Sequence, residues 1–251
     1  MNIIKIIFKK DDSWITDSYK TPKFYIGIIF VFIYYIGNML SEKLAIRVTS
    51  LMHPEYILES QEFYKLLGTN PWEFTGIRLL WVIILFGIMY FAGIKFFHTY
   101  KGMDKKKLFK WFVLGLVSLS ILQGISVWMT QINGSMTANQ LLLNKQLINN
   151  NWATKVIVFM LLPAFGEELV MRGIIQRYVF SKLPYIGIFV SAFLFQSMHY
   201  TTRLTDALLY FASGLVFAVV YHKTGKLELT MGLHAINNFI ALILIGLTYK
   251  A

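Results

Sequence analysis

The chain has 251 residues, of which 56% are hydrophobic and 15% are charged. A typical soluble domain is about 25% charged, so the composition excludes a disordered chain and a water-soluble enzyme. The absence of cysteine excludes disulfides, thiolate catalysis and Cys-bound metals. The formal net charge of +11 indicates cytoplasmic loops facing anionic lipid, and no nucleic acid partner is expected.

Apolar segments long enough to cross a bilayer recur along the chain. A spanning helix needs about 20 mostly apolar residues, and this pattern predicts an all-α, polytopic integral membrane bundle of about seven transmembrane helices, within a range of six to eight. The segments are Phe24–Leu40, Ile77–Phe97, Leu108–Met129, Trp152–Phe180, Leu183–Tyr200, Asp206–His222 and Leu227–Tyr249.

Two stretches between these spans are expected at the membrane surface. Ser41–Thr75 contains several glutamates, so we expect it to be an amphipathic or loop segment rather than a span. Met136–Asn150 is rich in Asn, Gln and Leu, and it favours a short interfacial helix. Lys and Arg concentrate before the first span and around Lys105–Lys107, which predicts a cytoplasmic N-terminus by the positive-inside rule. Seven spans would then leave the C-terminus outside.

Polar side chains occur in the second half of the chain at positions where a span should be apolar. Each ionisable group at the bilayer centre costs about 2.5–3.5 kcal/mol, so such groups need a structural or functional reason. The ionisable side chains are Glu167, Glu168 and Arg172 in the fourth span, His199 in the fifth and His234 in the seventh. The seventh span also carries the polar amide of Asn238.

Helical spacing sorts these residues into pairs. Glu168 and Arg172 are four residues apart and can form an ion pair on one helix face. Glu167 is rotated by about 100° from that face and stays outside the pair. Counting a rise of about 1.5 Å per residue places Glu167, His199 and His234 at similar depths. We therefore expect them to converge on one buried polar chamber.

Three interpretations of this chamber remain open. The groups could pair to hold the bundle together, line a proton or ion path, or perform catalysis. An ion-coupled transporter is expected to carry an inverted repeat with polar residues in both halves, whereas here they lie in the second half alone.

Peptide hydrolysis requires an activated water and hydrogen-bond donors for the developing oxyanion. Glu167 with His199 could hold and deprotonate a water, while His234 and Asn238 could donate to the carbonyl oxygen. Glu168 and Arg172 would brace the helix and hold Glu167 in place. Glu167, His199 and His234 are also an acceptable ligand set for a divalent metal such as zinc, and a metal-bound water and a water held by Glu and His alone both fit these residues.

The three motifs resemble those of the CPBP family of intramembrane endopeptidases, the CAAX protease and bacteriocin-processing (Abi) family, and within it the type II CAAX prenyl proteases. Their pattern is Glu-Glu-x-x-x-Arg, Phe-x-x-x-His and His-x-x-x-Asn, in this order on successive membrane helices, and the chain matches all of it. The matching positions are Glu167, Glu168, Arg172, Phe195, His199, His234 and Asn238.

The resemblance implies a glutamate-type peptidase, with metal assistance left open. It assigns water activation to Glu167 and His199 and oxyanion stabilisation to His234 and Asn238. Glu168 completes the catalytic set, with Arg172 and Phe195 as structural support. It divides the chain into an N-terminal transmembrane region, 1–151, with a cytoplasmic lead and extracytoplasmic loops, and CPBP-like catalytic helices, 152–251.

The expected function is hydrolysis of a membrane-associated peptide or protein within the lipid bilayer. Richness in Lys, Ile, Asn and Phe is typical of an AT-rich bacterial genome, which favours a bacterial cell membrane and disfavours a prenylated substrate. Peptide maturation, bacteriocin immunity and surface-protein processing are the roles that the resemblance implies. Because some members of the family act without proteolysis, a non-catalytic scaffold or immunity protein is the alternative. No feature of the sequence sets an oligomeric state.

Overall fold

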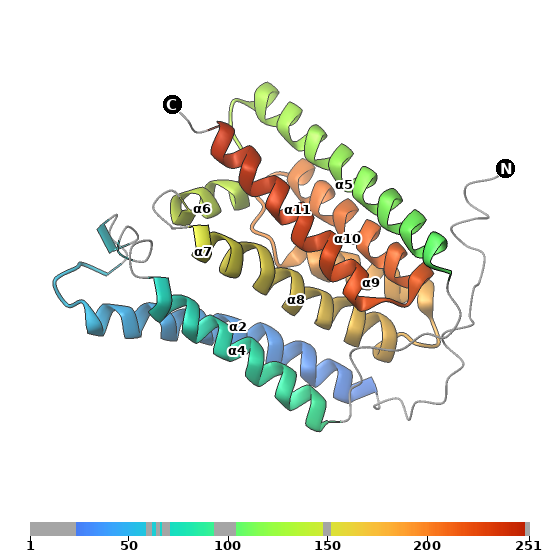
Figure 1. Cartoon of the computed structure of the whole chain (residues 1–251), viewed down its shortest axis with the longest axis horizontal. Helices are drawn as coiled ribbons and strands as arrows, with labels where there is room; N and C mark the ends of the chain where they lie inside the picture. The colour runs from blue at the N-terminus through green and yellow to red at the C-terminus, as the bar shows by residue number, and fades with distance from the viewer. Residues whose placement is uncertain are drawn as a thin grey trace.

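The structure is a computed structural model that describes residues 24–58, 62–63, 66, 71–92, 104–147 and 152–248. Within these residues every regular element is a helix, and the helices lie side by side in a bundle (Figure 1). The basic segment before residue 24, which is expected to be cytoplasmic, lies outside the described residues. The elements are α2 (Phe24–Met52), α4 (Pro71–Phe91), α5 (Lys105–Asn133), α6 (Ala138–Leu147), α7 (Trp152–Thr154), η2 (Lys155–Leu161), α8 (Leu162–Glu168), η3 (Leu169–Val179), α9 (Pro184–Ser197), α10 (Leu204–Thr224) and α11 (Leu227–Thr248).

The predicted all-α polytopic membrane bundle is confirmed. Five helices are long and apolar enough to cross a membrane by themselves, namely Gly27–Met52, Trp72–Phe91, Lys105–Asn133, Leu204–Thr224 and Leu227–Gly246. Helices also occupy the other two predicted segments. One of them is α9, an apolar helix of 14 residues, and the other is the continuous helical run from Trp152 to Val179.

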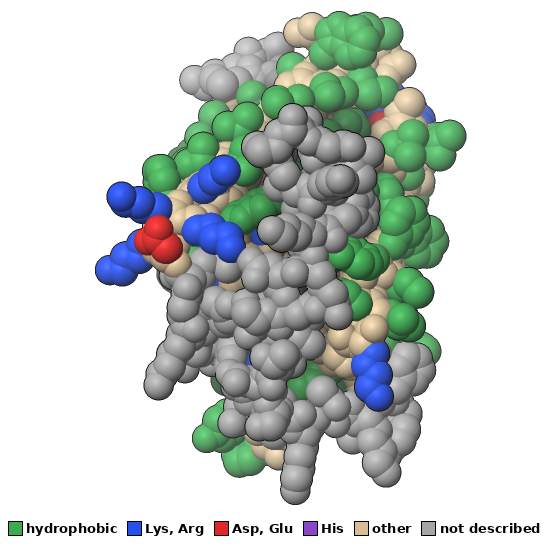
Figure 2. Space-filling view, turned by 90° about the vertical axis from the view of Figure 1, so that its right-hand side faces the viewer, with side chains coloured by type: hydrophobic (Ala, Val, Ile, Leu, Met, Phe, Trp, Pro, Cys, Tyr) green, Lys and Arg blue, Asp and Glu red, His purple; other side chains and the backbone are tan. Residues whose placement is uncertain are grey.

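The outside of the bundle is strongly apolar. Large hydrophobic side chains are exposed on every long helix, including Phe32 (61%), Ile83 (58%), Phe109 (68%) and Phe189 (62%). Figure 2 shows such side chains distributed over the height of the molecule. Soluble monomers rarely expose contiguous apolar surface of this extent, so lipid is the solvent that this surface fits.

The helix α2 extends further than the sequence predicts. The expected span ended at Leu40, but the helix continues to Met52, so the first part of Ser41–Thr75 is helical and that boundary was wrong. Polar groups in the extension find partners close by. Arg78 of α4 donates to the Asn38 carbonyl at 2.7 Å and to Ser41 Oγ at 3.1 Å. The short helix expected within Met136–Asn150 is present as α6.

The fourth predicted span departs from ideal α-helical geometry on both sides of the glutamates. The stretches η2 and η3 are π-helical, and the Phe180 N–H donates to the Ile175 carbonyl, five residues back, at 3.0 Å. π-Helical turns are rare and are frequent at functional sites. The assumption of about 100° per residue therefore holds only for α8, the short α-helical stretch that contains Glu167 and Glu168.

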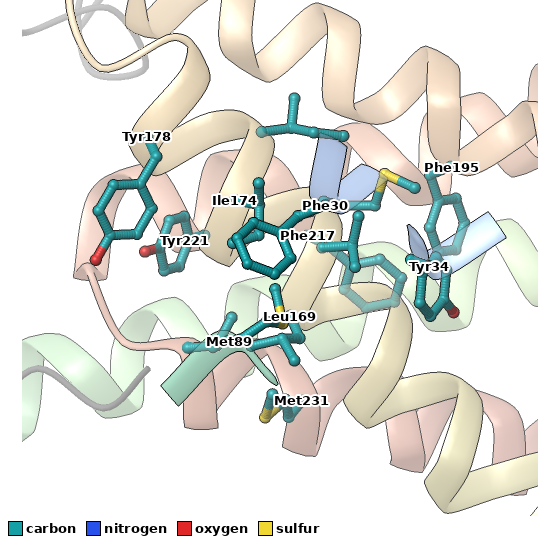
Figure 3. Close-up of a cluster of buried hydrophobic side chains, with 14 of the residues drawn as sticks. Phe30, Tyr34, Met89, Leu169, Ile174, Tyr178, Phe195, Phe217, Tyr221 and Met231 are labelled. Carbon is teal, nitrogen blue, oxygen red and sulfur yellow. The ribbon is translucent and has the colours of Figure 1, made fainter. Parts of the chain in front are cut away.

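The stretch η3 lies at the centre of the hydrophobic core, where Leu169, Met171 and Ile174 are fully buried. Aromatic side chains from α2, α9 and α10 surround it, as the labelled residues of Figure 3 show. Because η3 follows Glu168 directly, this packing fixes the direction in which the two glutamates project. A tightly packed core element is thus the support of the polar site.

Candidate functional site

A buried ion pair links the first motif to the neighbouring helix. Arg172 Nη1 donates to Glu168 Oε1 at 3.1 Å, and both side chains are 0% exposed. Arg172 Nη2 donates to the Gly214 carbonyl of α10 at 2.7 Å. The guanidinium also lies over the rings of Phe195 and Phe217, at 5.2 and 5.4 Å from their centroids. The predicted pairing of Glu168 with Arg172 is present, and it anchors the end of α8 to α10.

His234 of α11 lies between the two glutamates. Its Nδ1–H donates to Glu168 Oε1 at 3.1 Å, and its Nε2 lies 4.0 Å from Glu167 Oε2. The ring stacks on Phe217 with centroids 4.8 Å apart. The sequence assigned Glu168 to the catalytic set and to bracing its helix, and it did not predict the contact between Glu168 and the imidazole of His234.

The position of His199 is set by its own backbone and by two rings. The residue lies just beyond the end of α9, and its Nδ1–H donates to the Phe195 carbonyl at 2.8 Å. This bond leaves Nε2 as the nitrogen that can accept a proton or a hydrogen bond. The Phe195 ring lies 4.7 Å from the imidazole, and the Tyr210 ring stacks on it at 4.2 Å with an interplanar angle of 21°.

The amide of Asn238 is bound to the helix that carries the glutamates. Its Nδ2 donates to the Phe159 carbonyl at 3.3 Å. Pro163, four residues after Phe159, has no N–H and therefore cannot donate an α-helical bond to that carbonyl. Asn238 therefore has a structural task in addition to the predicted oxyanion role, although the second amide hydrogen on Nδ2 remains for another acceptor.

The predicted residues surround one cavity of about 220 Å³, which is lined by Glu167, Phe195, His199, His234 and Asn238. The motifs come from three separate parts of the chain, and the convergence expected from their depths is present. Glu168 and Arg172 do not line the cavity and lie behind it. Glu167 Oε2 is buried and has no hydrogen-bond partner within the described part of the chain, which leaves a carboxylate oxygen for a molecule in the cavity.

Several cavity residues are ones that sequence reasoning missed. Tyr210 of α10 is held at its hydroxyl by Asn139 Nδ2 of α6 at 3.2 Å. Gln123 of α5 and Asn237 of α11 also line the cavity and contact each other. The signal that could have found Gln123 is an amide in the middle of an apolar span. Tyr210 carries no comparable signal, because tyrosine is common near membrane interfaces.

The metal site considered for Glu167, His199 and His234 stays a prediction. Across the described ranges, no group of three or more His, Asp or Glu side chains is placed so that it could hold a metal ion. His199 and His234 each donate Nδ1–H to a protein oxygen, which leaves the Nε2 of each ring as the nitrogen that could bind a ligand. No step below is routed through a metal.

Comparison with known protein families gives a match within the second half of the chain. Residues 149–240 match the family model described as type II CAAX prenyl endopeptidase Rce1-like. No curated protein and no solved structure matches the chain. The matched segment contains Glu167, His199, His234 and Asn238, which are among the residues that line the cavity. Residues 149–240 are therefore similar to the Rce1-like domain of the CAAX-type proteases, within a chain whose helices are those of an integral membrane protein.

Proposed function

We propose that the chain is an endopeptidase that hydrolyses a membrane-associated peptide or protein inside the bilayer with a water activated by Glu167 and His199. The observation that carries this proposal is the single cavity shared by Glu167, His199, His234 and Asn238. Hydrolysis needs a base, a position for water and oxyanion donors within one space, and these side chains can supply all three.

In the proposed reaction Glu167 accepts a proton from a water that also donates to His199 Nε2. The water oxygen forms a bond to the carbonyl carbon of the peptide, whose π electrons move onto the carbonyl oxygen. The C–N bond then breaks as the oxyanion reforms the carbonyl, and the proton held by Glu167 passes to the leaving nitrogen. The products are a carboxylic acid and an amine, and Glu167 is again a carboxylate.

The oxyanion is stabilised by His234 and Asn238. With Nδ1–H donated to Glu168, His234 acts as an imidazolium in this step and donates its Nε2–H to the oxyanion. Asn238 adds the amide hydrogen that is not used by the Phe159 carbonyl. Preorganised donors in a site without bulk water stabilise developing charge strongly, and removing one of them typically costs about 10²–10³ in kcat.

The proposed setting is a bacterial cell membrane with the N-terminus in the cytoplasm. The proposed roles are peptide maturation, bacteriocin immunity and processing of surface proteins. A scaffold or immunity protein of the same family that binds its partner without cleaving it is the alternative, and the experiment below separates the two.

The test uses the full chain in lipid nanodiscs, as wild type and as Glu167→Ala, His199→Ala and His234→Ala. Peptides that co-purify with Glu167→Ala are identified by mass spectrometry, synthesised and offered to each protein. We expect the Glu167 variant to lose about 10²–10⁴-fold in cleavage rate. The control is Glu228→Gln, which removes an acid that is 51% exposed in the first turn of α11. Undiminished cleavage by all three alanine variants would reject the mechanism.

A further inference from the structure

Two amide side chains contact each other at the cavity wall, and neither is a defining residue of the three motifs. Gln123 Nε2 donates to Asn237 Oδ1 at 3.1 Å and approaches the Asn237 carbonyl at 3.5 Å. Gln123 belongs to α5, outside the segment that matches the protease family. Asn237 directly precedes Asn238 on α11, so the pair lies beside the proposed oxyanion donors.

Each amide retains hydrogen-bonding capacity after this contact. A side-chain amide offers two N–H donors and one oxygen acceptor. Their mutual bond uses a donor of Gln123 and the oxygen of Asn237, which leaves Gln123 Oε1 and Asn237 Nδ2. Within the described residues no further hydrogen bond involves these two atoms. Both residues line the cavity, and we assign this remaining acceptor and donor to a molecule bound there.

A purely structural role explains this pair only in part. Amides do hold transmembrane helices together through hydrogen bonds between helices. One interhelical bond between α5 and α11 satisfies that role, and it does not require the pair to border the cavity that contains Glu167. An acceptor next to a donor is the complement of the N–H and C=O that an extended peptide backbone presents on one side.

We propose that the Gln123–Asn237 pair is a backbone-binding subsite that holds an extended, apolar segment of the substrate peptide next to the reacting carbonyl. Gln123 Oε1 accepts from a peptide N–H, and Asn237 Nδ2 donates to a peptide C=O. The inference deepens the proposed function and rests on it. In a membrane a peptide backbone must be unwound before hydrolysis, and its freed polar groups need partners within the protein.

The cavity wall around the pair also indicates which side chains the peptide carries there. Leu122, Leu242 and Ile245 line the cavity on the same two helices. These side chains fit apolar residues and disfavour charged ones, since a charge placed among them would lose its hydration without compensation. The substrate class is therefore a hydrophobic peptide segment bound in extended form.

The test measures peptide binding separately from cleavage. A short Ala/Leu peptide with a terminal fluorophore is titrated onto the full chain in nanodiscs in the Glu167→Gln background, and Kd is taken from fluorescence anisotropy. A hydrogen bond contributes about 0.5–1.5 kcal/mol, so Gln123→Leu and Asn237→Leu should each raise Kd by about 2- to 12-fold. Gln131→Leu, an exposed amide on the same helix, should leave Kd unchanged.

A second arm identifies the atoms involved. Peptides that are N-methylated at one backbone position at a time each lack one N–H donor. Methylation at one of these positions should weaken binding to the protein that retains Gln123 by a similar factor. The same methylated peptide should bind the Gln123→Leu variant no more weakly than the unmethylated peptide does. The swapped variant Gln123→Asn/Asn237→Gln, which keeps both amides, should bind more tightly than the double leucine variant.

The outcomes separate this inference from the proposed function. Amide-dependent binding without cleavage by the wild type would reject the peptidase but keep the subsite. Cleavage that depends on Glu167, together with a Kd that Gln123→Leu does not change, would reject the subsite and keep the peptidase. Absence of any binding of the apolar peptides would also overturn the subsite.

Discussion

The Nδ1 of His234 lies 3.1 Å from Glu168 Oε1, although 66 residues separate the two in the sequence. The same carboxylate oxygen accepts from Arg172 at 3.1 Å. The buried carboxylate of Glu168 thus links η3 to α11, and the Nε2 of His234 faces Glu167. The glutamate that does not border the cavity is a positioning residue for an imidazole that does.

Glu168→Gln should lower both stability and activity, since it leaves the buried Arg172 without a counter-charge. Breaking a buried ion pair on one side costs about 3–5 kcal/mol. The double variant Glu168→Gln/Arg172→Met removes both charges and should recover much of the thermal stability. It should not recover peptide cleavage, because His234 still lacks its carboxylate. Thermal unfolding and cleavage rates measured on the same nanodisc samples check this, and equal recovery of both would contradict the orienting role.

Tyr210→Leu should reduce kcat more than it raises KM, because the ring stacked on His199 at 4.2 Å is lost. Aromatic contacts of this kind contribute about 0.5–1.5 kcal/mol, which corresponds to about 2- to 12-fold in rate. Tyr210→Phe is the matched control, as it keeps the ring and loses only the hydroxyl contacts to α6. A kcat for the phenylalanine variant as low as that of the leucine variant would show that stacking is not what matters.

Asn238→Leu should lose stability as well as activity, because the Phe159 carbonyl loses its side-chain donor. The contact is part-buried, and losing one hydrogen bond of this kind costs about 0.5–1.5 kcal/mol. Adding Pro163→Ala supplies a backbone N–H four residues after Phe159. The double variant should therefore regain stability but remain impaired in cleavage. If Pro163→Ala restored cleavage too, the amide would be purely structural.

Gly214→Ala should destabilise the bundle. An added Cβ would lie 3.0 Å from both the Cα and the carbonyl oxygen of Ala192, which is backbone and cannot move aside easily. Overpacking of this kind costs about 1–3 kcal/mol, and it would also disturb the carbonyl that accepts from Arg172. Gly124→Ala is the control, since nothing lies within 4 Å of its added Cβ. Equal thermal stability of the two variants would contradict the close packing of α9 on α10.

Local patterns in the sequence were sufficient for the class of protein and for the contacts within single helices. The length and apolarity of the segments predicted the membrane bundle, because crossing a bilayer imposes both. The spacing of Glu168 and Arg172 predicted their ion pair, since residues four apart share a helix face. The end of α2 was predicted wrongly because partners for its polar groups come from α4, which spacing along one segment does not reveal.

The tertiary structure alone decided which groups meet between helices. Glu168 contacts His234, Tyr210 stacks on His199, and Gln123 pairs with Asn237 at a separation of 114 residues. Helical periodicity says which face a side chain occupies but not which neighbouring helix that face meets. That choice depends on how the helices pack around η3, with close approaches such as the one at Gly214 setting the distances. The sequence therefore determined the membrane fold class and the polar residue types of the candidate site, and only packing decided which carboxylate contacts which imidazole.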